Sequence, residues 1–159
     1  MKKNTLGLLV GLCVLLTGCG TKYTRETSFS EAGVSTYVKE TLTLGKDTFK
    51  LVEETSMSLS GSVLGSFDAY VKFAYSGTAE ATDKENTYKL IIESLIVSNY
   101  TCEGDAANIG NLAMKTAFSA MFDDATVTYI MDGEKVSIEN ASNFLPTYVV
   151  VDPETKTFK

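Results

Sequence analysis

The chain has 159 residues and a formal net charge of −6 at pH 7, and it contains neither histidine nor tryptophan. Without histidine it can build no Ser-His-Asp or Cys-His catalytic group, no zinc or copper site with a histidine ligand and no histidine pH switch. Its acidic balance argues against a nucleic-acid partner and against general adhesion to anionic lipid surfaces.

The first segment of the chain has the pattern of a secretory signal. Lys2 and Lys3 give a short positive start, and an apolar run of eleven residues, interrupted only by glycines, extends from Leu6 to Leu16. A membrane-spanning helix needs about 20 apolar residues, so this run is too short to span a bilayer and predicts the core of a signal peptide. Small residues and a cysteine follow it.

The motif Leu16-Thr17-Gly18-Cys19 resembles the lipobox of the bacterial lipoprotein family, which is a leucine, two small residues and an invariant cysteine. In that family a dedicated peptidase cuts before the cysteine, whose sulfur carries a diacylglyceryl group and whose freed amine is often acylated. The resemblance implies cleavage between Gly18 and Cys19 and a lipid, with palmitate among its acyl chains, on Cys19. One chain contributes only about 0.8 kcal/mol per buried CH₂, so two or three make the anchor lasting.

The lipobox divides the chain into three expected parts. Residues 1–18 are the signal peptide, residues 19–35 are the lipidated N-terminus with a flexible polar tether, and residues 36–159 are a single domain. Loss of the signal changes the formal net charge to −8. The processed chain keeps one unmodified cysteine, Cys102, for which the readings are a small buried apolar residue or a disulfide to a second copy.

Alternation of apolar and polar residues predicts strands along most of the body. The longest, 67–82, turns at 83–86 into a strand whose parity shifts near Glu93-Ser94, which predicts a β-bulge. Gly77 is expected to mark a bend in this hairpin. Besides the last few residues, which follow a turn at 152–155, the predicted strands are 36–44, 49–59, 67–82, 88–100, 126–131, 136–138 and 148–151.

One segment changes to a helical period. Apolar and small residues at i, i+3, i+4 and i+7 predict a helix over about residues 105–122, covering an open end or face of the sheet. Asp132-Gly133 then predicts a tight hairpin, because a type I′ turn needs positive φ at both central residues. The predicted inward stripe of the helix is Ile109, Leu112, Ala113, Thr116, Ala117, Ala120 and Met121.

Consecutive hairpins predict a mainly β fold, an antiparallel meander of about eight strands that forms a barrel or a strongly coiled half-barrel with one helix packed on it. On the long hairpin 67–100 and the short Asp-Gly hairpin, the body loosely resembles the lipocalin-like, or calycin-type, barrels of several bacterial lipoproteins. It departs from that family in lacking the Gly-x-Trp motif and in placing its helix in mid-chain. A half-open sheet covered by the helix is the alternative.

Two kinds of candidate site follow. A small apolar ligand would be lined by inward-facing residues, although these residues can equally fill the core. Asp105 and Asp123-Asp124 lack the spacing of a calcium loop, so they predict a solvated helix end, and we expect no metal or other cofactor. Glu53, Glu80 and Glu93 are expected to face water. The candidate ligand-binding residues are Phe67, Val71, Phe73, Tyr75, Leu90 and Ile92.

These features predict a non-enzymatic protein of the bacterial cell envelope. It would be anchored by its lipid to the cell membrane or the outer membrane, facing outside the cytoplasm, and would bind a small hydrophobic ligand or a partner protein of the envelope. The alternative is a structural or interaction module with a filled core. A hydrolase that uses carboxylates alone ranks third, and it requires two acids that converge in one cleft.

Overall fold

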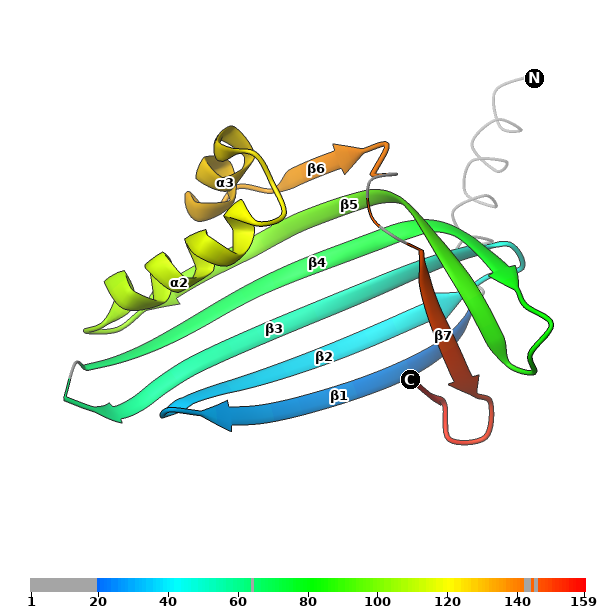
Figure 1. The fold of residues 1–159 in the computed structure, drawn as a ribbon, viewed down its shortest axis with the longest axis horizontal. Helices are drawn as coiled ribbons and strands as arrows, with labels where there is room; N and C mark the ends of the chain where they lie inside the picture. Colours follow the sequence, from blue (N-terminus) through cyan, green and yellow to red (C-terminus); the bar gives the residue numbers. More distant parts are fainter. Residues whose placement is uncertain (1–19, 64, 142–143, 145) are drawn as a thin grey trace, which may run out of the picture.

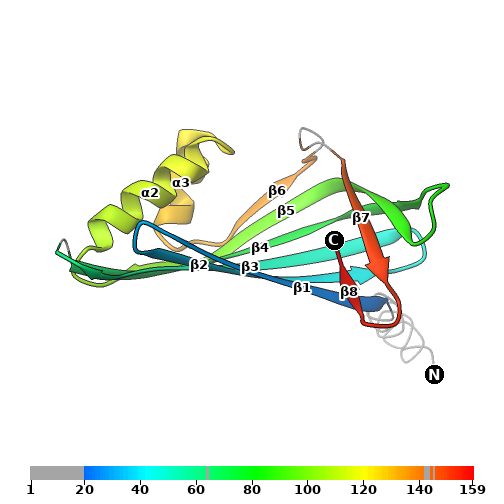
Figure 2. The ribbon, with the colours of Figure 1, turned by 60° about the horizontal axis from the view of Figure 1, so that its bottom comes forward.

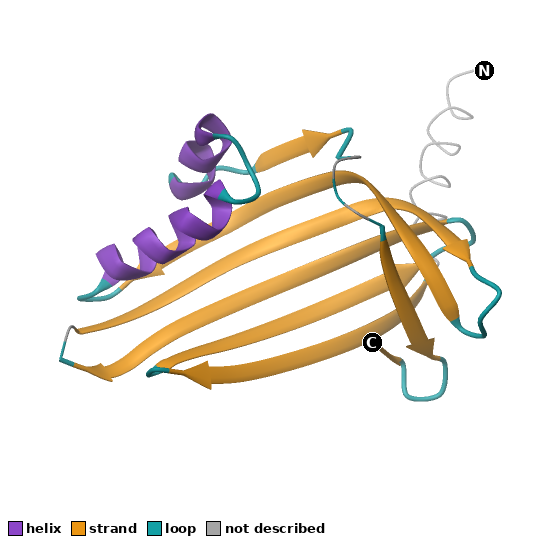
Figure 3. Ribbon diagram, viewed as in Figure 1, coloured by secondary structure: helices purple, strands orange, loops and turns teal. Residues whose placement is uncertain are grey.

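The computed structural model describes residues 20–63, 65–141, 144 and 146–159. The predicted signal peptide, the cleavage site predicted at Gly18 and Cys19, which is predicted to carry the lipid, therefore lie outside the described residues. The described chain is mainly β, as predicted, but it has two helices where the sequence predicts one (Figures 1 and 3). Its elements are β1 (Thr21–Glu31), β2 (Val34–Leu44), β3 (Thr48–Ser62), β4 (Gly65–Ala81), β5 (Thr87–Glu103), α2 (Ala107–Ser119), α3 (Asp124–Met131), β6 (Val136–Glu139), β7 (Thr147–Asp152) and β8 (Thr157–Phe158).

Strands β1 to β5 form an antiparallel meander, in which each strand pairs with the next. The pairing continues from β5 to β7, from β7 to β8 and from β8 back to β1, so the hydrogen bonding runs in a ring. The returning side of the ring is short. β5 pairs with β7 over four residues, and β8 meets β1 at the single pair Thr24–Thr157. The ring is therefore closed only near one end of the long sheet.

A bulge bends the long β4–β5 hairpin at the predicted place. Ser76 pairs with Ser94 while Gly77 pairs with Ile92, so Glu93 is the extra residue. A Cβ on Gly77 would lie 2.0 Å from the carbonyl oxygen of Ile91, which explains why glycine occupies this position. Figure 1 shows both strands curling over at this end of the sheet.

Two separate covers lie on the same face of the sheet (Figure 2). Helices α2 and α3 pack over β4 and β5, and β7 and β8 cover the curled end. Under the helices, the ring of Phe118 meets those of Phe73 and Tyr100 edge-on, with centroids 6.3 and 5.7 Å apart. Under β7 and β8, the buried cluster includes Leu42 and Leu90. Each cover therefore has its own packed core.

The segment predicted as a tether forms a strand instead. β1 pairs along its whole length with β2, through a two-residue turn at Ala32-Gly33, where φ is positive at both residues (52° and 84°). That is the backbone of a type I′ hairpin. Tyr23 is buried, whereas most other β1 side chains are exposed. A strand with so few buried residues shows no clear alternation of apolar and polar residues, so its polar composition resembles that of a linker.

Helix α2 confirms the predicted helix, but its buried face is not the predicted one. The buried residues are Gly110, Met114 and Phe118, whereas Leu112 is 66% exposed and Met121 is 43% exposed. A Cβ on Gly110 would lie 2.7 Å from Cys102 Sγ and 2.8 Å from a ring carbon of Phe67. Glycine at position 110 thus lets the helix approach the sheet closely. The large buried side chains of Met114 and Phe118 then determine which face of α2 is turned toward the sheet.

The segment predicted as strand 126–131 is helix α3. Asp123 caps its start by accepting a hydrogen bond from the backbone N–H of Thr126 at 2.8 Å. Gly133, with φ at 78°, ends it, and the N–H of Gly133 bonds to the carbonyl of Ile130 at 2.9 Å. The tight hairpin predicted at Asp132-Gly133 is therefore wrong: φ is −77° at Asp132 and positive only at Gly133, which is the usual way to end a helix.

Candidate functional site

Three charged side chains occupy one cross-strand row on the covered face of the sheet. Arg25 of β1 lies opposite Glu40 of β2, and Glu40 lies opposite Glu53 of β3. Side chains of directly opposed residues point to the same side of a sheet. The row continues into Phe73 of β4, which is part of the core under the helices. Charged groups are thus placed between the two packed clusters.

Arg25 and Glu40 form a bidentate ion pair. Arg25 Nε donates to Glu40 Oε2 at 2.5 Å, and Nη2 donates to Oε1 at 2.6 Å. Glu40 is only 6% exposed, and the guanidinium also lies over the ring of Phe158, 4.8 Å from its centroid. A buried carboxylate needs such a partner, because an unpaired charge in this position costs several kcal/mol.

Glu53 is half-buried and has no such bidentate cation of its own among the described residues. Its Oε1 accepts a hydrogen bond from the Thr55 hydroxyl at 3.1 Å. Burial raises the pKa of the Glu53 carboxyl above its ordinary value of 4.5, and the neighbouring Glu40 raises this pKa further, whereas Thr55 and Arg25 lower it. Like charges directly opposite one another across strands are destabilising. The carboxylate of Glu53 is therefore the least satisfied charge in the row.

An open pocket of about 300 Å³ lies over this row, between the end of α2 and β7. Its polar side is the Arg25, Glu40 and Glu53 row, and its other walls are mainly apolar and aromatic. The remaining lining residues are Leu51, Tyr75, Ile92, Met121, Phe144, Thr147, Tyr148, Val149 and Phe158.

The six predicted ligand-binding residues do not gather at one place. Phe67 packs beneath the start of α2, Val71 and Phe73 pack under both helices, and Leu90 packs under β7. Tyr75 and Ile92 line the 300 Å³ pocket. Tyr75 packs against both of the larger clusters, so it stands at the boundary where the pocket opens.

The charged row is absent from the sequence-based predictions. Glu53 was expected to face water, but it shares the parity of Phe49 and Leu51 and lies on the covered face with them. Glu40 likewise interrupts the apolar parity of β2. A glutamate at a position where the alternation calls for an apolar residue was therefore the sequence signal that could have placed Glu40 and Glu53 on the covered face. No such signal existed for Arg25, because its strand was not predicted. Glu80 and Glu93 are exposed, as expected.

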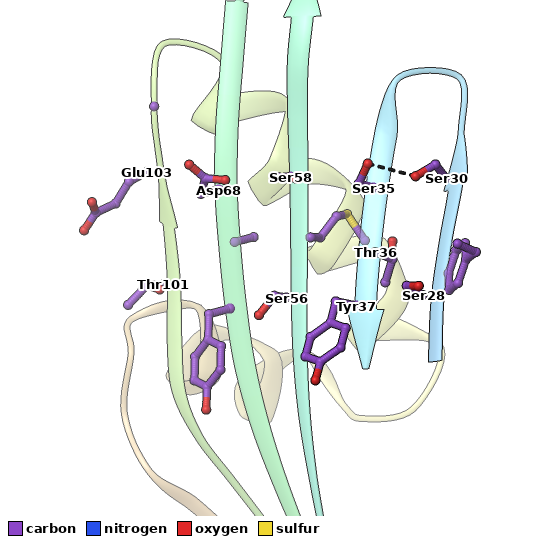
Figure 4. A pocket seen from close by; sticks show the side chains of 15 residues that line it. Ser28, Ser30, Ser35, Thr36, Tyr37, Ser56, Ser58, Asp68, Thr101 and Glu103 are labelled. Atoms are coloured by element: carbon purple, nitrogen blue, oxygen red, sulfur yellow. Dashed lines mark hydrogen bonds between the residues drawn. The ribbon is translucent and has the colours of Figure 1, made fainter. Parts of the chain in front are cut away.

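A second, larger pocket lies on the opposite face of the sheet (Figure 4). It measures about 750 Å³ and is rich in hydroxyl groups, among them Ser28, Ser56 and Tyr37. The hydroxyls of Ser30 and Ser35 are 2.9 Å apart, and Asp68 lies opposite Glu103 across β4 and β5. This face is a polar surface of the sheet, and no described helix or strand covers it.

Among the described residues, no group of three or more Cys, Asp or Glu side chains is placed to hold a metal ion. None of the helices in the same part of the chain is long and apolar enough to cross a membrane. The thiol of Cys102 is half-buried and donates to the Ala107 carbonyl at 3.5 Å. Burial raises the pKa of this thiol.

A scan against protein-family models and searches of curated proteins and of solved structures find no match. The 300 Å³ pocket is the place where charge, aromatic walls and partial enclosure coincide. We take this pocket as the candidate functional site.

Glu53 makes the stability of the fold depend on pH. Because its pKa is raised in the folded protein, the folded state holds the proton more tightly than the unfolded state, and stability falls as pH rises from about 4.5 through the folded pKa. Glu53→Gln removes this penalty. The variant should be more stable than the wild type at pH 7 in urea unfolding, and the difference should disappear below pH 4.5. The exposed Glu31→Gln is the matched control, and it should change the stability at pH 7 by less than Glu53→Gln does. A Glu53→Gln variant that is less stable at pH 7 would contradict the assignment.

Proposed function

We propose that this protein is a non-enzymatic, lipid-anchored protein of the bacterial cell envelope that binds a small, mainly hydrophobic ligand in the pocket between α2 and β7. The observation that carries the proposal is the pocket itself: about 300 Å³ of open space with aromatic and aliphatic walls and a few convergent polar groups. That is the usual composition of a small-molecule site, and the volume is at the lower end of the usual range.

The packing around the pocket supports a site for a ligand. Both neighbouring clusters are filled, with Leu42, Leu90, Leu95 and Ile130 fully buried. The 300 Å³ pocket lies at the boundary between these two filled clusters. A sheet that is covered at two places by different elements leaves such a gap, because neither cover extends across it.

The lipobox supports the anchor. β1 begins at Thr21, two residues after Cys19, so a lipid on that cysteine would hold the domain against the membrane without a long tether. The acyl chains would supply the binding, since a chain with a formal net charge of −6 gains no overall attraction to anionic lipid.

The two alternative functions, an interaction module and a hydrolase that uses carboxylates, would use different parts of the structure. An interaction module would leave the pocket without a ligand and use exposed apolar residues such as Leu112. A hydrolase that uses carboxylates needs two of them free to act. Glu40 and Glu53 do share the pocket, but both oxygens of Glu40 accept hydrogen bonds from Arg25. Only Glu53 would be left for acid–base chemistry, which favours binding over hydrolysis.

The pocket can be tested with a fluorescent reporter, because the chain contains no tryptophan. Tyr148 lines the pocket and is 63% exposed, so Tyr148→Trp places a single tryptophan at its mouth. Titration with octan-1-ol should shift the emission to shorter wavelength and saturate. In the same background, Ile92→Phe should fill the pocket and weaken binding at least about tenfold.

Ile91→Phe is the matched control, because Ile91 pairs with Thr78 on the opposite face of the sheet. It should leave binding unchanged. Octan-1-ol that does not saturate, or that binds the Ile92→Phe variant as well as the parent, would overturn the proposed ligand site.

The anchor is tested at Cys19. Cys19→Ser removes the sulfur that the thioether needs, so the variant should remain unprocessed by the lipoprotein peptidase and carry no lipid. Metabolic labelling with palmitate in a bacterial host, followed by mass measurement of the purified chain, reads both effects. Palmitate incorporation into the Cys19→Ser chain would show that the anchor is elsewhere.

A further inference from the structure

We propose that the pocket selects ligands that carry one positively charged amine at the end of an apolar body, and that Glu53 is the residue that receives this amine. The inference rests on the ligand-binding function proposed above and adds the chemical class of the ligand. It comes from the charge and the geometry of the row that forms the polar side of the pocket.

The charges that line the pocket leave one negative charge in excess. Among the described lining residues, Arg25, Glu40 and Glu53 are the ionisable groups with a charge at neutral pH, one positive and two negative. A monocation would bring the lining to neutrality. A carboxylate or phosphate ligand would add to the excess and would be buried beside two carboxylates.

Arg25 is already committed to Glu40. Two of its donors are held by Glu40 oxygens at 2.5 and 2.6 Å, and its guanidinium rests over Phe158. The positive charge of the pocket is thus neutralised within the protein and held at a fixed place. An anionic ligand would have to compete with a bidentate, buried carboxylate for that guanidinium.

Glu53 is the group that gains most from a cation. It lies directly opposite Glu40, and the hydrogen bond that it accepts comes from the neutral hydroxyl of Thr55. An ammonium group beside it would offset the repulsion between the two carboxylates and would add a charge-assisted hydrogen bond. No other carboxylate among the described lining residues is free of a bidentate partner.

The walls suit a cation with an apolar tail. Tyr75, Phe144 and Tyr148 bring aromatic rings to the pocket lining, and Leu51 and Ile92 bring aliphatic surface. Aromatic faces attract ammonium groups, and this attraction is larger where water is partly excluded. The same walls would hold the hydrocarbon part of the ligand. Both parts of an amphipathic amine therefore find complementary surface.

Three probes with the same eight-carbon chain separate the effect of the ligand's charge from that of its apolar tail: octylamine, octan-1-ol and octanoate. Each probe is titrated by calorimetry at pH 7 into the wild type, into the Glu53→Gln variant and into the Glu54→Gln variant. Glu54 is the neighbouring residue on the opposite face, ion-paired with Lys72 at 3.6 Å, so its replacement changes the net charge equally without touching the pocket. Octylamine should bind the protein about tenfold more tightly than octan-1-ol, and octanoate should bind most weakly.

The preference should disappear in Glu53→Gln, where octylamine and octan-1-ol should bind alike, and should persist in Glu54→Gln. Three outcomes would overturn this inference: equal binding of the amine and the alcohol to the wild type, tightest binding of octanoate, or a preference for the amine that survives Glu53→Gln. Each of these would leave the proposed ligand site standing. Failure of all three probes to bind would overturn the proposed function as well.

Discussion

The ion pair between the buried Glu40 and the half-buried Arg25 fixes how the first strand joins the rest of the sheet. Glu40 is placed by its register among apolar residues of β2 and is almost fully removed from water. A carboxylate in that position is tolerated only with a partner of opposite charge. Arg25 reaches it because β1 pairs with β2 in one register, directly opposite. Phe158 of β8 then packs on the guanidinium, which links the ion pair to closure of the ring.

The same row explains why the covered face keeps an open pocket. Charged side chains in the middle of the face separate two apolar clusters, and each cluster is covered by a different part of the chain. The helices end their contact near Phe73, and β7 begins its contact near Leu90. A continuous apolar face would have favoured one continuous cover. The charged row therefore forms the polar side of the pocket that opens at the boundary between the two covers.

Much of this fold is readable from local patterns. Strands β2 to β5 alternate clearly because one face of each is buried, and the parity shift at Glu93 locates a bulge that the structure confirms. β1 escapes prediction because few of its side chains are buried, so its sequence does not alternate. Helix α3 escapes it because Val127 and Tyr129 fit a strand, while its buried residues, Val127 and Ile130, have helical spacing. Local propensity does not distinguish these two readings.

The candidate site was less predictable than the fold, for a physical reason. A glutamate in an apolar register is visible in the sequence of β2 and of β3, but its meaning depends on what lies opposite. Arg25, Glu40 and Glu53 are far apart in sequence and meet only through the registers of two hairpins. Which face of α2 is buried was likewise hard to predict. Gly110 lies on the buried face because it lets the helix approach Cys102 and Phe67 closely, and not because glycine is hydrophobic.

A double-mutant cycle at Arg25 and Glu40 tests the structural role of their ion pair most directly. Urea unfolding would compare the wild type with Arg25→Met, Glu40→Gln and the double variant. Arg25→Met leaves a buried carboxylate unpaired and should cost about 3–5 kcal/mol. Adding Glu40→Gln should recover a large part of that loss, giving strong coupling between the two positions. Additive losses would contradict this role, because they would show that the ion pair does not hold β1 in its register against β2.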